Sequence, residues 1–260
     1  MAYHLDRGDP QLMKVVFQDA KLWKSVVQAL STMVDETAFT FTPEGVRMRA
    51  MDPSRIAMVD FEMPSTSFEE YICEAETKVG VNLDQLNKLV KRASTGEKLE
   101  LELKPGEGRL KLKLKGRATR VFAVPLIDLG YEELPTPRVS FNAQARLLAD
   151  AMEDALRDAE LVSDHVKIQA TQEELTFQAS SDKGESSTTF TKDGGALLEL
   201  NVKEPSRSMY SLTYLLDMMK AAAAADILEL RFSTNIPLTL IFDLPGGGKI
   251  QYWLAPRLEE

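Results

Sequence analysis

The sequence has 260 residues, a formal net charge of −9 and an ordinary hydrophobic fraction of 44%. This length fits one large domain or two of about 130 residues, and the hydrophobic fraction suffices for a buried core. The acidic excess argues against a conventional nucleic-acid binder, because such proteins neutralise phosphates with Lys and Arg. No run of about 18 apolar residues occurs, which excludes a typical transmembrane helix. With no visible secretory signal and a single cysteine, Cys73, the sequence predicts a cytoplasmic protein.

Short alternating runs dominate the chain and predict β-strands with one buried and one exposed face. The clearest runs are 38–42, 99–103, 109–115, 174–178 and 228–232. Only four segments have a helical period, and each has an apolar stripe suited to packing on a sheet. The four predicted helices are 21–33, 83–93, 146–160 and 212–225.

The two halves of the chain resemble each other. A helical segment followed by an alternating run occurs in each half, and an offset of 129 positions superposes Leu83 on Leu212. Phe17, before the first predicted helix, is likewise expected to match Phe141, before the third. The sequence therefore predicts two copies of a strand–helix–strand unit, with a period well above that of solenoid repeats.

A connector is predicted between the two copies, at 124–137. It contains one glycine and three prolines, which interrupt regular structure. Leu129 and Leu134 make it too apolar for a plain solvated linker. Two interpretations stay open: the connector packs on the protein, or it helps to bind something.

Residues suited to catalysis or metal binding are not clustered in the sequence. Two isolated histidines, His4 and His165, accompany the single cysteine, so a zinc cluster of the usual spacing is not predicted. No phosphate-binding or nucleophile motif occurs, and the glycines at 246–248 are expected to form a hairpin turn. An enzyme is not predicted, since the alternative of a hydrolase lacks its acid–base cluster.

Three carboxylates, Asp150, Asp154 and Asp158, recur every four residues along the third predicted helix. They form either a solvated acidic face or a ladder for basic side chains of another chain, such as Lys111 or Lys113, and the two readings have equal weight. A catalytic pair is less favoured, because nothing nearby indicates burial or a raised pKa.

Basic residues recur on the exposed faces of the four predicted helices, from Lys21 in the first to Lys220 in the last. Acidic residues concentrate in loops and on strand surfaces instead. If all four helices share one surface, that surface is less acidic than the rest of the molecule. Its position could then permit a role on DNA that the net charge alone argues against.

Four segments resemble the conserved motifs of a known protein family. They are 45–56 (GVRMRAMDPSRI), 80–91 (GVNL followed by LNKLVK), 126–129 (LIDL) and 252–260 (YWLAPRLEE). Together they resemble the proliferating cell nuclear antigen (PCNA) family, the sliding clamps of archaea and eukaryotes. The match extends over essentially the whole chain with its spacing preserved, and the ending resembles the archaeal type.

The resemblance implies an α+β clamp fold in which helices line the inside and antiparallel sheets lie outside. Two similar domains, 1–125 and 138–260, would be joined by the connector 126–137. Three subunits would close a ring around duplex DNA. Strand 109–115 of one subunit would pair with strand 185–192 of the next, near the three aspartates, which could there meet Lys111 and Lys113. The basic residues implied to face DNA are Lys21, Lys24, Lys88, Lys91, Arg92, Arg157 and Lys220.

The resemblance also implies a pocket beneath the connector for a short partner motif with two aromatic residues and one aliphatic residue. Burial of one aromatic anchor contributes about 1.5–3 kcal/mol. The implied partners are DNA polymerase, flap endonuclease, DNA ligase and the clamp loader, with no cofactor and no metal. The implied pocket residues are Met51, Leu129, Leu134, Pro237, Trp253, Ala255 and Pro256, with Arg257 at the rim.

The sequence departs from the family pattern at three positions. Thr136 stands where an aliphatic residue is frequent, and Trp253 replaces the usual tyrosine. Glu153 stands on the third helix where relatives often have a basic residue. Either this helix contributes less to an inner surface, or the chain is a specialised subunit that closes a ring only with unlike sibling chains.

Overall fold

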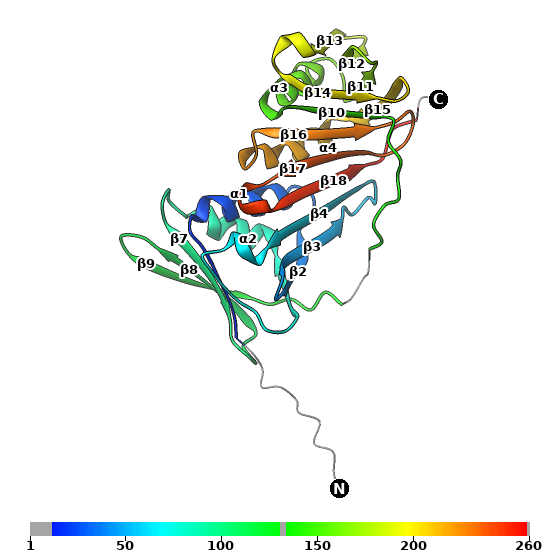
Figure 1. Cartoon of the computed structure of the whole chain (residues 1–260). Coiled ribbons are helices and arrows are strands. Elements are labelled where there is room, and N and C mark those ends of the chain that lie inside the picture. Colours follow the sequence, from blue (N-terminus) through cyan, green and yellow to red (C-terminus); the bar gives the residue numbers. More distant parts are fainter. Residues whose placement is uncertain (1–11, 131–133, 259–260) are drawn as a thin grey trace.

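The computed structural model describes residues 12–130 and 134–258, which form three antiparallel sheets with helices packed on one side (Figure 1). The first half contains β1 (Met13–Phe17), α1 (Ala20–Leu30), β2 (Glu36–Thr42), β3 (Gly45–Met51), β4 (Ala57–Pro64), β5 (Glu70–Ile72), β6 (Thr77–Asn82), α2 (Leu83–Val90), β7 (Lys98–Leu103), β8 (Arg109–Lys115) and β9 (Thr119–Pro125). The second half contains β10 (Ala143–Leu148), α3 (Ala149–Glu160), β11 (His165–Ala170), β12 (Glu174–Ser181), β13 (Gly184–Thr191), β14 (Leu197–Val202), β15 (Ser206–Ser211), α4 (Leu212–Met218), β16 (Ile227–Phe232), β17 (Leu238–Asp243) and β18 (Lys249–Leu254). Short 3₁₀ helices are η1 (Ser65–Ser67), η2 (Lys192–Gly194), η3 (Met219–Ala223) and η4 (Pro245–Gly247).

The two halves repeat one order of elements and one set of strand pairings. Strands β5-β1-β7-β8-β9 are neighbours in the first half, and β14-β10-β16-β17-β18 are neighbours in the same order in the second. Likewise, β4-β3-β2-β6 corresponds to β13-β12-β11-β15. The predicted duplication is therefore confirmed, and β9 is the counterpart of β18 as β4 is of β13.

The predicted helices exist, but their ends differ. The third helix begins at Ala149 instead of position 146, because residues 143–148 form β10. The fourth is α-helical to Met218 and then tightens into η3. Phe17 ends β1 whereas Phe141 precedes β10, so the expected match between these two phenylalanines is wrong. The turn predicted at 246–248 is confirmed, since η4 joins the antiparallel strands β17 and β18.

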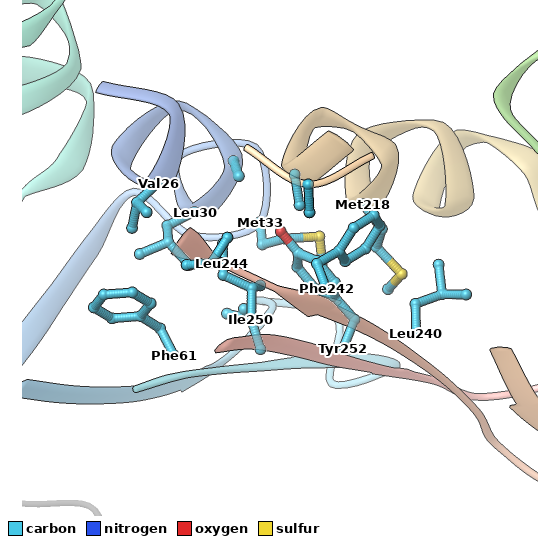
Figure 2. Packing of buried hydrophobic residues seen from close by; sticks show 14 of the residues in the cluster. Val26, Leu30, Met33, Phe61, Met218, Leu240, Phe242, Leu244, Ile250 and Tyr252 are labelled. Atoms are coloured by element: carbon cyan, nitrogen blue, oxygen red, sulfur yellow. The ribbon is translucent and has the colours of Figure 1, made fainter. Parts of the chain in front are cut away.

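One nine-stranded sheet passes through both halves because β18 pairs with β4. In this junction Tyr252 pairs with Val59, and the Lys249 ammonium lies 3.0 Å from the Glu62 carboxylate. Figure 2 shows side chains from both halves, among them Met33 and Tyr252, in one apolar layer between sheet and helices. The halves thus share a continuous core, which holds their relative orientation.

The strand expected to pair between subunits is not at a sheet edge. Residues 109–115 form β8, which is hydrogen-bonded to β7 on one side and to β9 on the other. The prediction that β8 pairs with a neighbouring subunit is therefore wrong, because its backbone groups are already used. The edge strand is β9, whose sequence alternates too weakly to stand out. The other expected strand, 185–192, falls largely within β13, which does lie at an edge.

Glu100, on β7, is only 2% exposed and lies on the side of its sheet opposite the helices. Its carboxylate accepts hydrogen bonds from Lys113 at 2.7 Å and Lys115 at 2.5 Å. Burial raises the pKa of the Glu100 carboxyl, but the hydrogen bonds and charges of the two lysines outweigh burial and lower it. The charged form therefore contributes stability above the unfolded-state pKa of about 4.3, and that stability is lost as the pH falls through the lower folded-state pKa.

We expect Glu100→Gln to lower the free energy of unfolding at pH 7 by about 2 kcal/mol, because the half-buried Lys113 and the exposed Lys115 both lose their charged partner. Denaturant titrations between pH 7 and pH 3 measure the loss. The difference between wild type and variant should shrink below about pH 4, as the wild-type carboxyl becomes protonated. Glu174→Gln at an exposed position is the control. Equal effects of the two substitutions would contradict the stabilising role of Glu100.

Candidate functional site

A groove of about 850 Å³ lies on the face of the nine-stranded sheet that is opposite the helices. Strands β2 and β3 and the turn after Met51 form its base, and the connector forms one wall. Three of the seven predicted pocket residues, Met51, Leu129 and Leu134, line it. Leu129 is exposed, whereas Met51 and Leu134 are half-buried. Charged and polar side chains share the lining with these apolar residues, and a concave surface of this mixed kind suits a ligand or peptide.

The other four predicted pocket residues lie on the neighbouring strands and do not line this groove. Met51 pairs with Met58, and Met58 pairs with Trp253, so these three side chains point to one face of the sheet. Trp253 is only 7% exposed and belongs to the floor of this face. Pro237, Ala255 and Pro256, all half-buried, flank it at the ends of β17 and β18.

The connector is fixed to the sheet at both ends of the groove. The Ile127 amide donates to the Gly80 carbonyl at 2.9 Å, and a Cβ at Gly80 would lie 2.0 Å from the Ile127 carbonyl oxygen. Only glycine permits this approach. At the other end, Arg49 Nη1 donates to the Leu134 carbonyl at 3.1 Å and to Thr136 Oγ1 at 2.8 Å. The apolar connector therefore packs on the protein, and it also supplies a wall of the groove.

Arg49 is held in turn by an ion pair with Asp60 on the adjacent strand. Thr136 is a further acceptor for this arginine. Its hydroxyl thus helps to hold the connector.

The turn between β3 and β4 is built around one buried carboxylate. Asp52 accepts hydrogen bonds from the backbone amides of Ser54, Ile56 and Ala57 at 2.7–2.9 Å. Tyr214 of α4 donates its hydroxyl to the same carboxylate at 2.7 Å. Burial raises the pKa of Asp52, but these hydrogen bonds outweigh it and lower the pKa below its ordinary value. Asp52 is therefore charged at neutral pH.

The four helices form a continuous layer on the opposite face of the molecule. α1 contacts α2 and η3, and α3 contacts α4 and η3 (Figure 1). Asp19 and Asn82 cap α1 and α2 by accepting backbone amide hydrogen bonds. The seven predicted DNA-facing residues all lie on or directly after these helices, and except for Lys24 they are exposed.

Charge is uneven along this helix layer. Lys24 Nζ donates to the Lys91 carbonyl at 3.4 Å, so it bridges α1 and α2. Lys88 pairs with Asp84 at 2.6 Å, and Arg157 pairs with Glu153 at 2.5 Å. The predicted acidic ladder is exposed on α3, where it makes this helix acidic overall. The basic surface therefore lies on α1, α2 and η3 rather than on all four helices.

The helices next to the two edge strands differ in the charge around them. α2 contacts β9, and the exposed Lys91 and Arg92 follow it. The acidic α3 contacts β13. Lys111 and Lys113 point away from the helix layer, because they alternate with the buried leucines of β8. Both are occupied within the chain, by Glu107 and by Glu100 and Glu102. The expectation that they meet the α3 aspartates of another subunit stays a prediction, which these pairs within the chain do not favour.

Comparison with known proteins identifies the family of this chain. The family model of the proliferating cell nuclear antigen N-terminal domain matches residues 12–129, and that of its C-terminal domain matches residues 136–257. The chain belongs to the proliferating cell nuclear antigen family. A protein of Thermofilum pendens named DNA polymerase sliding clamp is 46% identical over 95% of this chain and 100% of its own length. DNA polymerase sliding clamp 1 of Pyrobaculum aerophilum is 39% identical over 94% of this chain and 98% of its own length.

Solved structures of PCNA proteins have the same fold. The crystal structure of PCNA from Thermococcus kodakaraensis superposes with a TM-score of 0.91 at 34% identity, covering 94% of this chain and 100% of that one. A chain from the PCNA2–PCNA3 complex of Sulfolobus tokodaii gives a TM-score of 0.88 at 32% identity, with 95% and 100% covered. The sequence motifs implied membership of the PCNA family and an α+β clamp fold, and both are confirmed.

Two features of the groove were not predicted from the sequence of this PCNA-family chain. Arg49, which fixes the connector, lies inside a recognised motif, but its acceptors are 85 and 87 residues away along the chain. The Asp52–Tyr214 hydrogen bond spans 162 residues. Asp-Pro-Ser at 52–54 is a turn signal that could have identified Asp52 as the acceptor for its own loop. No local signal pointed to Tyr214.

The remaining residues considered for chemistry are dispersed. His165 lies next to Arg257, whose Nη1 is 2.6 Å from the imidazole Nε2, while His4 lies outside the described residues. Within 12–130 and 134–258, no group of three or more His, Cys, Asp or Glu side chains could hold a metal ion. No helix in the same part of the chain is long and apolar enough to cross a membrane.

Proposed function

We propose that this chain is a sliding clamp subunit: three copies close into a ring around duplex DNA, and the outer groove docks DNA polymerase and other enzymes of replication and repair. The junction between β18 and β4 carries this proposal, because it contains a template for joining one subunit to the next. The names of the relatives, DNA polymerase sliding clamp, support the same role.

The template follows from the repeat. β9 is the counterpart of β18, and β13 is the counterpart of β4. Joining β9 of one subunit to β13 of the next would combine a five-stranded and a four-stranded sheet into the same nine-stranded arrangement that the chain already contains. A head-to-tail contact of this kind closes a ring when its rotation divides a full turn. Each subunit would contribute one internal junction and one junction with the next subunit. A trimer would therefore contain six joints of the same kind.

The pairing register between subunits can be stated from the register within the chain. Gln251 pairs with Asp60 in the internal junction. The strand pairings of the two halves can be aligned strand by strand. This alignment makes Val121 on β9 the counterpart of Gln251 on β18, and Ser187 on β13 the counterpart of Asp60 on β4. Val121, an apolar residue on the open edge strand β9, is 56% exposed in the single chain. A neighbouring strand would cover it.

Electrostatic complementarity supports the same joint. Within the chain, α1 contacts η3. Their counterparts are α3 and the residues after α2, which include Lys91 and Arg92. The α3 ladder of Asp150, Asp154 and Asp158 would then face Lys91 and Arg92 of the next subunit, in place of Lys111 and Lys113. Such rim pairs contribute little affinity but favour the correct partner and register.

Encirclement is compatible with the net charge of −9. A ring retains DNA by topology, so its inner surface needs only weak, salt-sensitive contacts with phosphates. We propose that the basic positions of the helix layer make these contacts. The set consists of Lys21, Lys24, Lys88, Lys91, Arg92, Arg157 and Lys220, with Arg157 the weakest candidate because of its pair with Glu153.

The groove is proposed to take a short partner segment with two aromatic residues and one aliphatic residue. Met51, Leu129 and Leu134 line it, and Pro237, Trp253, Ala255 and Pro256 extend the same face toward the chain end. A few buried aromatic anchors dominate the free energy of such an interface. DNA polymerase, flap endonuclease, DNA ligase and the clamp loader are the partners proposed to present this segment.

We expect the double variant Val121→Cys/Ser187→Cys to form a covalent trimer on mild oxidation, visible on a non-reducing gel. Directly paired residues on antiparallel strands have Cα atoms about 4.5–5.5 Å apart, within the range that a disulfide spans. The native Cys73 is buried and does not compete.

The matched control is Val121→Cys/Thr189→Cys, which shifts the partner by two residues on the same face to about 7–8 Å. It should stay uncrosslinked. Equal crosslinking of both pairs, or a chain that stays monomeric and uncrosslinked, would overturn the proposed joint. If the crosslink forms only after sibling clamp chains are added, the proposal that the chain assembles with copies of itself is overturned.

For the groove, we expect Leu134→Ala to weaken binding of a peptide with two aromatic residues and one aliphatic residue by about tenfold, because part of the buried apolar contact is lost. Isothermal titration calorimetry measures the change. Leu198→Ala, at an exposed leucine on β14, should bind as wild type does. Unchanged affinity of the Leu134 variant would exclude the groove as the docking site.

A further inference from the structure

The turn between β3 and β4 forms one end of the groove, and its shape depends on Asp52. Asp52, Pro53 and Arg55 line the groove. Arg55 has a φ of 60°, a left-handed conformation that a non-glycine residue adopts only when its surroundings impose it. The Ile56 carbonyl accepts a hydrogen bond from the Ala255 amide at 2.8 Å, which ties the turn to the segment after β18. A displaced turn would therefore alter both the groove and the flanking pocket residues.

The Asp52 carboxylate imposes this shape. It is 4% exposed, and its two oxygens bind the amides of Ser54, Ile56 and Ala57. Its Oδ2 atom, which holds Ser54, also accepts the Tyr214 hydroxyl at 2.7 Å. A hydrogen bond to a charged acceptor is about twice as strong as one between neutral groups.

Tyr214 reaches the turn from the other half of the molecule. It lies on α4, a member of the helix layer, and its ring packs against the shared core. Burial and the Asp52 hydrogen bond raise the pKa of the Tyr214 hydroxyl, so it remains a donor at neutral pH. The hydrogen bond thus joins the helix layer to the opposite, groove-bearing face of the molecule.

We propose that Tyr214 is a positioning residue for partner docking: its hydroxyl fixes the Asp52 carboxylate and thereby the turn that shapes the groove. This inference rests on the proposed docking function of the groove. Tyr214 does not line the groove, so its effect on affinity acts through the turn and not through contact with the partner.

Tyr214→Phe removes the hydroxyl and keeps the ring, and two quantities measure its effect. We expect peptide affinity by calorimetry to fall about fivefold, the consequence of losing one charge-assisted hydrogen bond that orders the site. We expect amide hydrogen exchange at Ser54 and Ile56 to accelerate by a similar factor, because these amides bind the freed carboxylate.

The matched control is Tyr71→Phe, which also removes one hydroxyl bond, from Tyr71 to the Thr42 carbonyl at 2.7 Å. Its peptide affinity and turn exchange should equal those of wild type. If Tyr214→Phe binds peptide as wild type does, or binds weakly with unchanged exchange in the turn, the positioning role is overturned. If the wild-type protein itself binds no peptide, the docking function is overturned, while the exchange comparison still tests whether Tyr214 orders the turn.

Discussion

The hydrogen bonds between the backbones of two edge strands are the constraint on which this molecule depends. Each half of the chain builds a five-stranded and a four-stranded sheet, and the two halves satisfy one pair of edges through β18 and β4. The corresponding edges, β9 and β13, have no second neighbouring strand within the described part of the chain. Open edges with apolar side chains invite uncontrolled pairing, and natural proteins cover or charge them. Because Val121 is exposed on β9, a second copy is the simplest cover.

In the proposed ring, which these strands would close, the remaining surfaces have separate roles. The helix layer would face the enclosed space, where modest positive charge on α1, α2 and η3 is sufficient. The acidic α3 would lie at a joint, where its carboxylates would oppose basic residues instead of phosphates. The opposite face bears the groove, bounded by the connector that Arg49 holds in place. A ring that encircles DNA does not need many strong contacts with phosphates. The net negative charge is therefore compatible with a role on DNA.

The sequence predicted this architecture well where the information is local or repeated. Apolar periodicity located the helices, and the 129-residue offset revealed the duplication. It failed where geometry depends on distant partners. Nothing in a linear sequence shows, for example, that Glu100, Glu102 and Glu107 bind Lys111 and Lys113 within the chain. Residues 119–125 were missed as the edge strand because only sheet order distinguishes β9 from β8.

The groove was predicted in part for the same reason. Met51, Leu129 and Leu134 come together because the connector crosses β3, which the family motifs implied. Trp253 was expected as an open wall, but strand register and burial place it in the floor. Tyr214 could not be predicted, since its role arises from a contact across the interface between the halves.

The most direct test of encirclement uses the Val121→Cys/Ser187→Cys chain oxidised in the presence of nicked circular duplex DNA. After a wash at about 1 M salt, which screens ionic contacts to within about 3 Å, we expect the covalent trimer to stay with the circle and to be released when one enzymatic cut linearises it. Loss of the trimer from intact circles in salt, or its retention on linear DNA, would contradict the ring.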